Sequence, residues 1–266
     1  MREASPKITE EPQLDLRGYR NSNQWRVEET VESLFFIDTA LPSPNSRDMQ
    51  VLLEEIDRYH ERVRAALDVA STITELERRQ KLNTWLYAPD LLEESDLLNP
   101  NKPNMFYGTA NAAGIHLVSR GMAWDDPIVL RNVLHEIVHH WWTDQVGEAP
   151  SLLNEGIAVY FEHTLFTDVV KARGEFEHVW REYSRKAKPG FLRLLCTNEG
   201  FWAEYAAGEP VYRIGAQFVS FLLDDYGLKG VRRIFLESHF DDPEICERIE
   251  KVAGESIDSL EKRIAL

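Results

Sequence analysis

The chain has 266 residues, of which 43% are hydrophobic and 28% charged, a composition typical of a globular protein with a substantial core. Its formal net charge of −15 argues against nucleic acid or an anionic membrane as a partner, because both are bound through clustered Lys and Arg. The two cysteines, Cys196 and Cys246, form no Cys-x-x-Cys pair, which argues against a thiolate metal site and a disulfide framework.

The N-terminal part of the chain is polar and then helical in pattern. Residues 1–24 read as a polar tail without the apolar core of a secretory signal, and no stretch of the chain is apolar enough to span a bilayer. We therefore expect a cytoplasmic protein. Apolar residues spaced by three or four, such as Val27 and Val31, predict a helix over 25–40, and 47–70 predicts a longer one. This N-terminal helical segment, 25–80, would cap the active site or dock a partner.

Between residues 81 and 119 the pattern changes from helical to extended. The segments "LNTWLYAP", "MFYGTA" and "AGIHLVS" are short, rich in aromatic or β-branched residues, and bounded by Pro, Asn and Gly, as strands of a small sheet are. From residue 126 onward nearly everything has helical periodicity. The sequence therefore predicts an α+β fold, in which N-terminal helices precede a small sheet and a mostly helical half, with one domain over 81–266.

The stretch "VLHEIVHHWW" (133–142) places three histidines and a glutamate in an apolar helix. His135 and His139 are four residues apart, so both imidazoles lie on one face and can reach one tetrahedral ion. Glu136 then points beside the ion, where a general base takes a proton from water at the metal. The alternative is a pair of histidines hydrogen-bonded at a helix end, and His140 points away as an outer or surface group.

A third protein ligand separates these alternatives, because catalytic zinc normally keeps three. The long metzincin form of the motif fails, since the chain has Trp142 and Gln145 where that form needs Gly and His. Glu155 is a carboxylate early in a second predicted helix, "SLLNEGIAVYFE", where a divalent cation would compensate its burial. The rival, Glu148, lies in the connecting turn "VGEAP" and is expected to be solvated.

Together, "HEIVHHWW…LLNEGIAVYFE" resembles the gluzincin zinc peptidases, most closely the catalytic domain of the membrane alanyl aminopeptidase family. That resemblance implies a thermolysin-like zincin half and one zinc ion held by His135, His139 and Glu155. Fewer residues separate His139 from Glu155 than in that family. The later segment "VYRIGAQFVSFLLDDYG" resembles the helix in which the family carries a Tyr followed by x-x-Gly-Ala. By that match Tyr212 donates a hydrogen bond to the oxyanion.

The resemblance covers about residues 104 to 227. It implies that residues 108–119 form an active-site edge strand that pairs with an extended substrate. The Gly-x-Met-Glu-Asn signature for a free substrate amine and the family's large N-terminal β domain are both absent, so exopeptidase activity does not carry over.

The sequence therefore predicts a zinc metallopeptidase acting on a peptide or protein substrate, with Glu136 as general base and Tyr212 as oxyanion donor. The alternative from another class is a catalytically inactive or regulatory protein that binds peptides or a partner on the same scaffold. A zinc hydrolase with a substrate other than a peptide, or a chance motif, completes the set of alternatives.

Overall fold

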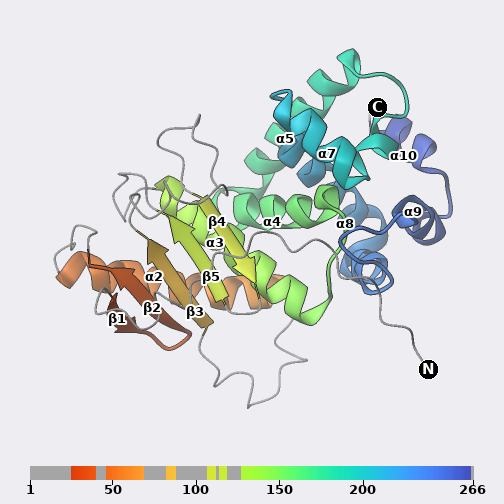
Figure 1. Cartoon of the computed structure of the whole chain (residues 1–266). Coiled ribbons are helices and arrows are strands. Elements are labelled where there is room, and N and C mark those ends of the chain that lie inside the picture. Colours follow the sequence, from red (N-terminus) through yellow and green to blue (C-terminus); the bar gives the residue numbers. More distant parts are fainter. Residues whose placement is uncertain are drawn as a thin grey trace, which may run out of the picture.

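The computed structural model describes residues 25–39, 46–68, 82–87, 107–111, 114–118 and 127–264. The predicted polar tail, residues 1–24, lies outside these ranges. The described part is α+β, with a small mixed sheet and a larger helical part (Figure 1). No helix within it has the length and apolar character needed to cross a membrane.

Five strands form the sheet in the order β1-β2-β3-β5-β4. They are β1 (Trp25–Glu29), β2 (Ser33–Asp38), β3 (Leu82–Tyr87), β4 (Tyr107–Asn111) and β5 (Gly114–Val118). The pairs β1/β2 and β4/β5 are antiparallel, whereas β3 runs parallel to both of its neighbours, β2 and β5. The three strands expected between residues 81 and 119 are thereby confirmed, and β4 forms one edge of the sheet.

The helix predicted over residues 25–40 is wrong, because this segment forms the β1–β2 hairpin. Buried and half-exposed side chains alternate along β2, with Ser33, Phe35 and Ile37 buried, which is the period of a strand with one face on a core. The helical spacing of apolar residues in this segment does not correspond to a buried face, since Val31 is 78% exposed in the turn between β1 and β2. The expected N-terminal helices are therefore a hairpin and one helix, and the hairpin belongs to the sheet.

One face of the sheet supplies part of the hydrophobic core. Across β2, β3 and β5, Phe35 lies opposite Thr84, which lies opposite Ile115, and all three side chains are buried. On the other face Phe36 stacks on Trp85, with ring centroids 5.3 Å apart. Thr84, Trp85 and Leu86 of β3 are buried at consecutive positions, as expected of a central strand covered on both faces.

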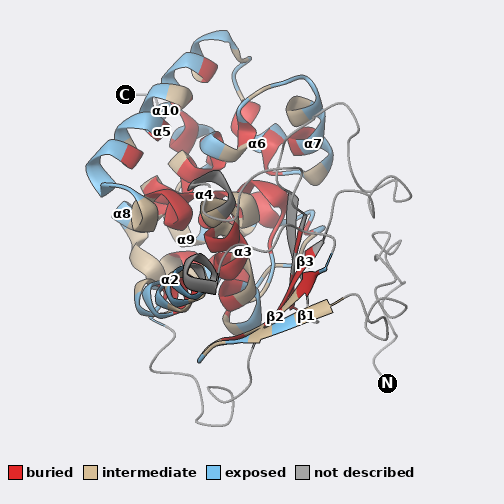
Figure 2. Ribbon diagram, turned by 90° about the vertical axis from the view of Figure 1, so that its left-hand side faces the viewer, coloured by how far each residue is buried: buried red, intermediate tan, exposed pale blue. Residues whose placement is uncertain are grey.

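The helices are α2 (Ser46–Ala66), α3 (Pro127–Gln145), α4 (Ser151–Phe166), α5 (Val169–Lys186), α6 (Phe191–Leu195), α7 (Asn198–Ala206), α8 (Val211–Leu236), α9 (Ile245–Ala253) and α10 (Ile257–Ile264). Helix α3 packs against β4, β5 and α2, and α4 packs against α3 and α8. Figure 2 shows the buried residues concentrated in α3 and α4, with exposed ones along the outer sides of α2 and α10. Cys196 and Cys246 are buried free thiols.

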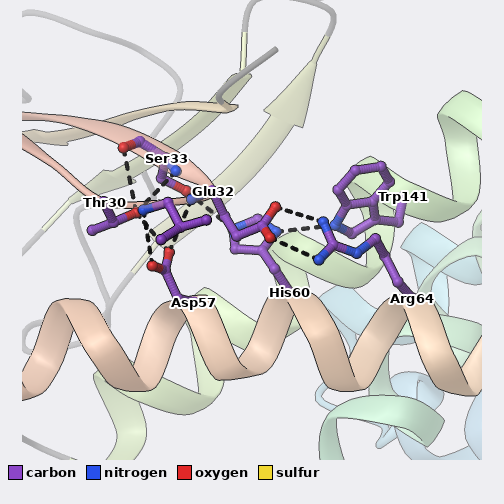
Figure 3. A network of polar contacts seen from close by, with 8 residues as sticks. Thr30, Glu32, Ser33, Asp57, His60, Arg64 and Trp141 are labelled. Atoms are coloured by element: carbon purple, nitrogen blue, oxygen red, sulfur yellow. Dashed lines mark hydrogen bonds and ion pairs between the residues drawn. The ribbon is translucent and has the colours of Figure 1, made fainter. Parts of the chain in front are cut away.

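Helix α2, which the sequence predicted, is joined to α3 by a buried polar network (Figure 3). Trp141 of α3 donates its indole N–H to His60 Nδ1 at 3.0 Å, so the neutral ring carries its hydrogen on Nε2 and donates it to Ser33 Oγ at 3.1 Å. Arg64 pairs with both carboxylate oxygens of Glu32, at 2.5 and 2.7 Å, and lies over the Trp141 ring. The β1–β2 hairpin, α2 and α3 are therefore held together through His60 and Arg64.

Helices α4 and α8 touch through their backbones. A Cβ added at Gly156 would lie 2.6 Å from the carbonyl carbon of Gly215, and one added at Gly215 would lie 2.5 Å from the carbonyl oxygen of Leu152. Both distances are far inside van der Waals contact, so only glycine fits at the two positions. The close approach brings Glu155, which directly precedes Gly156 on α4, and Tyr212, one helical turn before Gly215 on α8, toward the same part of the molecule.

Candidate metal centre

Helices α3 and α4 bring the three predicted ligands together. His135 Nε2 lies 3.1 Å from His139 Nε2 and 3.2 Å from Glu155 Oε2, and His139 Nε2 lies 3.5 Å from the same oxygen. The histidines share one face of α3, as their four-residue spacing predicted, and Glu155 reaches them from the second turn of α4. These three side chains can hold a metal ion.

The spacing of the three atoms fits a metal ion. Zinc–nitrogen and zinc–oxygen bonds of about 2.1 Å in a tetrahedron place neighbouring ligand atoms about 3.4 Å apart, which is close to all three separations. Each of these atoms carries a lone pair when the imidazoles are neutral and the carboxyl is ionised. Lone pairs that converge in a partly buried place repel one another unless a cation lies between them, so the donor set suits a divalent ion.

Hydrogen bonds hold the first turn of α4, and with it Glu155, in place. Asn198, the first residue of α7, accepts from the backbone N–H of Ser151 at 2.7 Å and from its hydroxyl at 2.8 Å. The Asn198 amide also donates to the carbonyl of Phe240 at 2.8 Å. The start of α4 is therefore tied to two other segments. Glu148, the rival ligand, is exposed in the turn before α4 and does not join the centre.

Glu162 contacts the candidate ligand His135 and was not predicted from the sequence. Its Oε2 lies 2.9 Å from His135 Nδ1, and its Oε1 lies 2.6 Å from Arg131 Nε. Carboxylates in this position fix the tautomer of a ligand histidine, leaving the other nitrogen free for the metal. The signal was present, because Glu162 follows Glu155 by seven residues and so lies two turns further along the same helix face.

The charges of the centre act strongly on one another. Burial would lower the pKa of His135, but its hydrogen bonds to Glu155 and Glu162 raise it well above the usual value. Burial would raise the pKa of Glu155, but the two histidines lower it well below the usual value. The carboxylate is thus held in the ionised form that ligation requires.

Glu136 and Tyr212 lie near this group without belonging to it. Glu136 is 6% exposed, and its pKa is raised by burial. Tyr212 lies in the first turn of α8, as predicted, and its pKa is raised by burial and by the charges of Glu155 and Glu136. The tyrosine therefore keeps its proton throughout the physiological range.

The other residues of the motif, His140, Trp141 and Trp142, pack in the protein interior or against one another. His140 packs against the Trp141 ring, with centroids 5.1 Å apart, and burial lowers its pKa. Trp141 and Trp142 are both buried in the core. None of the three side chains belongs to the metal-binding group, and for His140 this agrees with its prediction as an outer or surface group.

The chain matches no known protein-family model, no curated protein and no solved structure. Its similarity to gluzincins therefore rests on the motif residues alone. The chemistry of the centre is interpreted from its own geometry, in which two imidazoles and a carboxylate converge beside a buried glutamate and a protonated tyrosine.

Proposed function

We propose that the protein is a zinc-dependent peptidase of the gluzincin type, with one zinc ion held by His135, His139 and Glu155. The observation that carries the proposal is the convergence of their three ligand atoms within 3.1 to 3.5 Å, with Glu136 buried beside them. Two imidazoles and one carboxylate are a ligand set of catalytic zinc, which leaves a fourth position for water or substrate. Structural zinc sites use four protein ligands instead.

Zinc, when bound, polarises a substrate carbonyl and lowers the pKa of water at the site toward 7. Glu136 accepts the proton of the attacking water and passes it to the departing amine. Its burial supports this role, because a raised pKa lets a carboxylate hold a proton between the two steps. Tyr212 donates its phenolic hydrogen bond to the oxyanion that forms at the attacked carbonyl.

The edge of the sheet supports a peptide as the substrate. Strand β4 pairs with β5 on one side, and no other described strand pairs with its second edge. Because β4 also lies beside α3, which carries His135 and His139, an extended chain added to that edge would run close to the metal centre. Main-chain hydrogen bonds of this kind are a general way to bind peptides independently of their side chains.

The metal ligation is tested by elemental mass spectrometry on the wild-type protein, Glu155→Ala and Glu148→Ala. We expect near-stoichiometric zinc in the wild type and in Glu148→Ala, whose carboxylate is exposed outside the centre, and much less in Glu155→Ala. A folded wild type that takes up no zinc even when zinc is added back would overturn the proposal.

The catalytic step is tested by hydrolysis of a peptide library by the wild type and by Glu136→Gln. Loss of the base should lower the rate by roughly 10²- to 10⁴-fold while zinc content stays unchanged. Zinc loss in Glu136→Gln would contradict the role given to Glu136. A zinc-loaded wild type that binds peptides without cleaving any of them would instead support the inactive, peptide-binding alternative.

A further inference from the structure

Helix α7 places two aromatic side chains against Tyr212. The ring centroid of Tyr212 lies 5.4 Å from that of Tyr205 and 6.4 Å from that of Trp202, and the latter two are 5.7 Å apart. Trp202 is 41% exposed, which is unusual for an indole and leaves part of the ring open to a ligand. We call Trp202, Tyr205 and Tyr212 the aromatic shelf.

Packing and a hydrogen bond at the start of α7 fix the position of the aromatic shelf. Phe201 is fully buried below it, with its ring centroid 5.1 Å from Trp202 and 5.5 Å from Tyr212. At the start of α7, Thr197 accepts a hydrogen bond from Gly200, and a Cβ at Gly200 would lie only 2.2 Å from the carbonyl oxygen of Leu194. Helix α7 therefore packs directly against α6, which fixes the position of the helix that carries Trp202 and Tyr205.

The ring separations decide what kind of ligand fits. An aromatic cage for a cation needs rings that stand apart around the ion, whereas centroids 5.4 to 6.4 Å apart belong to rings already in contact. A ligand therefore lies over the shelf rather than between its rings. The surface that it meets is apolar and aromatic, which favours a flat or bulky apolar group.

Tyr212 belongs to both the shelf and the metal centre. Its ring contacts Trp202 and Tyr205, and the backbone contact of Gly156 with Gly215 packs its helix, α8, against α4, which carries Glu155. A group lying on the shelf is therefore a neighbour of whatever is bound at the metal ligands. We propose that the aromatic shelf binds an aromatic or large apolar side chain of the peptide substrate, close in sequence to the bond that is cleaved. This inference rests on the proposed peptidase function.

The experiment measures peptide binding rather than turnover. Zinc-loaded Glu136→Gln is titrated calorimetrically with hexapeptides that carry a single Phe at each position in turn, against an all-Ala reference. At one position we expect Phe to bind roughly 10-fold more tightly than Ala, the effect of covering part of one aromatic side chain. Adding Trp202→Ala should reduce that preference to less than 3-fold, and Trp202→Phe should restore most of it.

Leu236→Ala is the matched control, because Leu236 is also an exposed large apolar residue but lies at the far end of α8 from Tyr212. It should keep the full preference for Phe. Equal preferences with and without Trp202, in variants with the same far-ultraviolet circular dichroism, would overturn the proposal, and so would a lack of preference at every position.

The two proposals fail in different ways. Hydrolysis that depends on Glu136 but shows no aromatic preference overturns the shelf and leaves the peptidase standing. A preference for Phe that disappears with Trp202→Ala, in a protein that cleaves no peptide, overturns the peptidase and supports the shelf as a peptide-binding surface.

Discussion

Helix α3 takes part in two histidine environments, one around His60 of α2 and one around its own His135 and His139, and the two differ in how polar atoms are paired. At His60 each ring nitrogen meets one complementary partner, the indole N–H of Trp141 and the hydroxyl of Ser33. At His135 and His139 the ring nitrogens face each other and a carboxylate oxygen, at 3.1 to 3.5 Å. The first arrangement pairs every ring nitrogen without a ligand, whereas the second gathers three side chains that could hold a metal ion.

The protonation state of a histidine in the interior therefore depends on its hydrogen-bond partners and neighbouring charges. The tautomer of His60 is fixed by one donor and one acceptor, and burial lowers its pKa to about 3, so the ring stays neutral. His135 is partly buried, with 13% of its side chain exposed, and its hydrogen bonds to the carboxylates Glu155 and Glu162 raise its pKa. The pKa values of the two histidines thus shift in opposite directions, because charge outweighs desolvation at only one of them.

The largest expected difference concerns metal affinity. His139→Ala removes a ligand and should lower zinc affinity by more than about 100-fold, which is the upper end for loss of an outer partner. His60→Gln keeps a hydrogen-bond donor and an acceptor between Trp141 and Ser33 and should change zinc affinity less than about threefold. Competition with a chromophoric chelator measures both, and similar losses in the two variants would remove the distinction between the two sites.

Glu162→Gln should have the next largest effect, a loss of roughly 10- to 100-fold in zinc affinity, because the charged partner of His135 is replaced by a neutral one. Glu175→Gln is the control, since Glu175 is exposed and lies 4.0 Å from His163 rather than near the ligands. Unchanged affinity in Glu162→Gln would mean that Glu162 serves only to pair with Arg131.

The burial of neutral His60 should affect the pH dependence of protein stability. The pKa of His60 is about 3 in the folded protein, lowered by burial and by the charges of His140 and Arg64, against 6.5 for a free histidine. The contribution of neutral His60 to the free energy of unfolding is therefore complete above pH 6.5. It is lost as pH falls toward 3, by up to about 1.4 kcal/mol per pH unit.

Urea unfolding at pH 7.5 and pH 5.0 tests this prediction. The wild type should lose about 2 kcal/mol more than His60→Gln between the two values, because only the wild type gains a proton at this position on unfolding. Equal losses in the two proteins would show that His60 is not held neutral.

The smallest effect is expected at Arg64. Arg64→Lys keeps the charge but loses the two-pronged contact with Glu32 and the contact with the Trp141 ring, which should cost about 1 kcal/mol of unfolding free energy. Arg58→Lys, at an exposed pair with Glu55, should cost less than about 0.5 kcal/mol. Thermal unfolding measures both, and a loss of zinc in Arg64→Lys would show that the network also supports the metal centre.

The ligand positions were predictable because they depend on local geometry. The four-residue spacing of His135 and His139 decides which face of α3 they share, and Glu155 was expected early in a second helix. Glu162 was not expected, although it shares a face of α4 with Glu155, because its contact with His135 depends on how α3 and α4 cross. The catalytic roles of Glu136 and Tyr212 remain predictions.

In the N-terminal part of the chain, the secondary structure of α2 was predicted correctly, whereas that of residues 25–40 was not. The period of α2 was clear, whereas residues 25–40 contain apolar spacings compatible with a helix, and their alternation becomes visible only once β2 pairs with β3. That pairing joins segments separated by the whole of α2. The contact between Trp141 and His60 spans 81 positions, and no local pattern in the chain indicates such a partner.

The contact between Gly156 and Gly215 has an evolutionary consequence. A methyl group at either position would collide with the backbone of the opposite helix, and no change of a side chain on that helix can relieve the collision, because the contacts are with backbone atoms. Homologues that keep this helix crossing should therefore retain glycine at both positions, however far the surrounding sequence drifts. Paired with the histidine spacing of α3, the two glycines form a signature by which distant relatives of this chain can be sought.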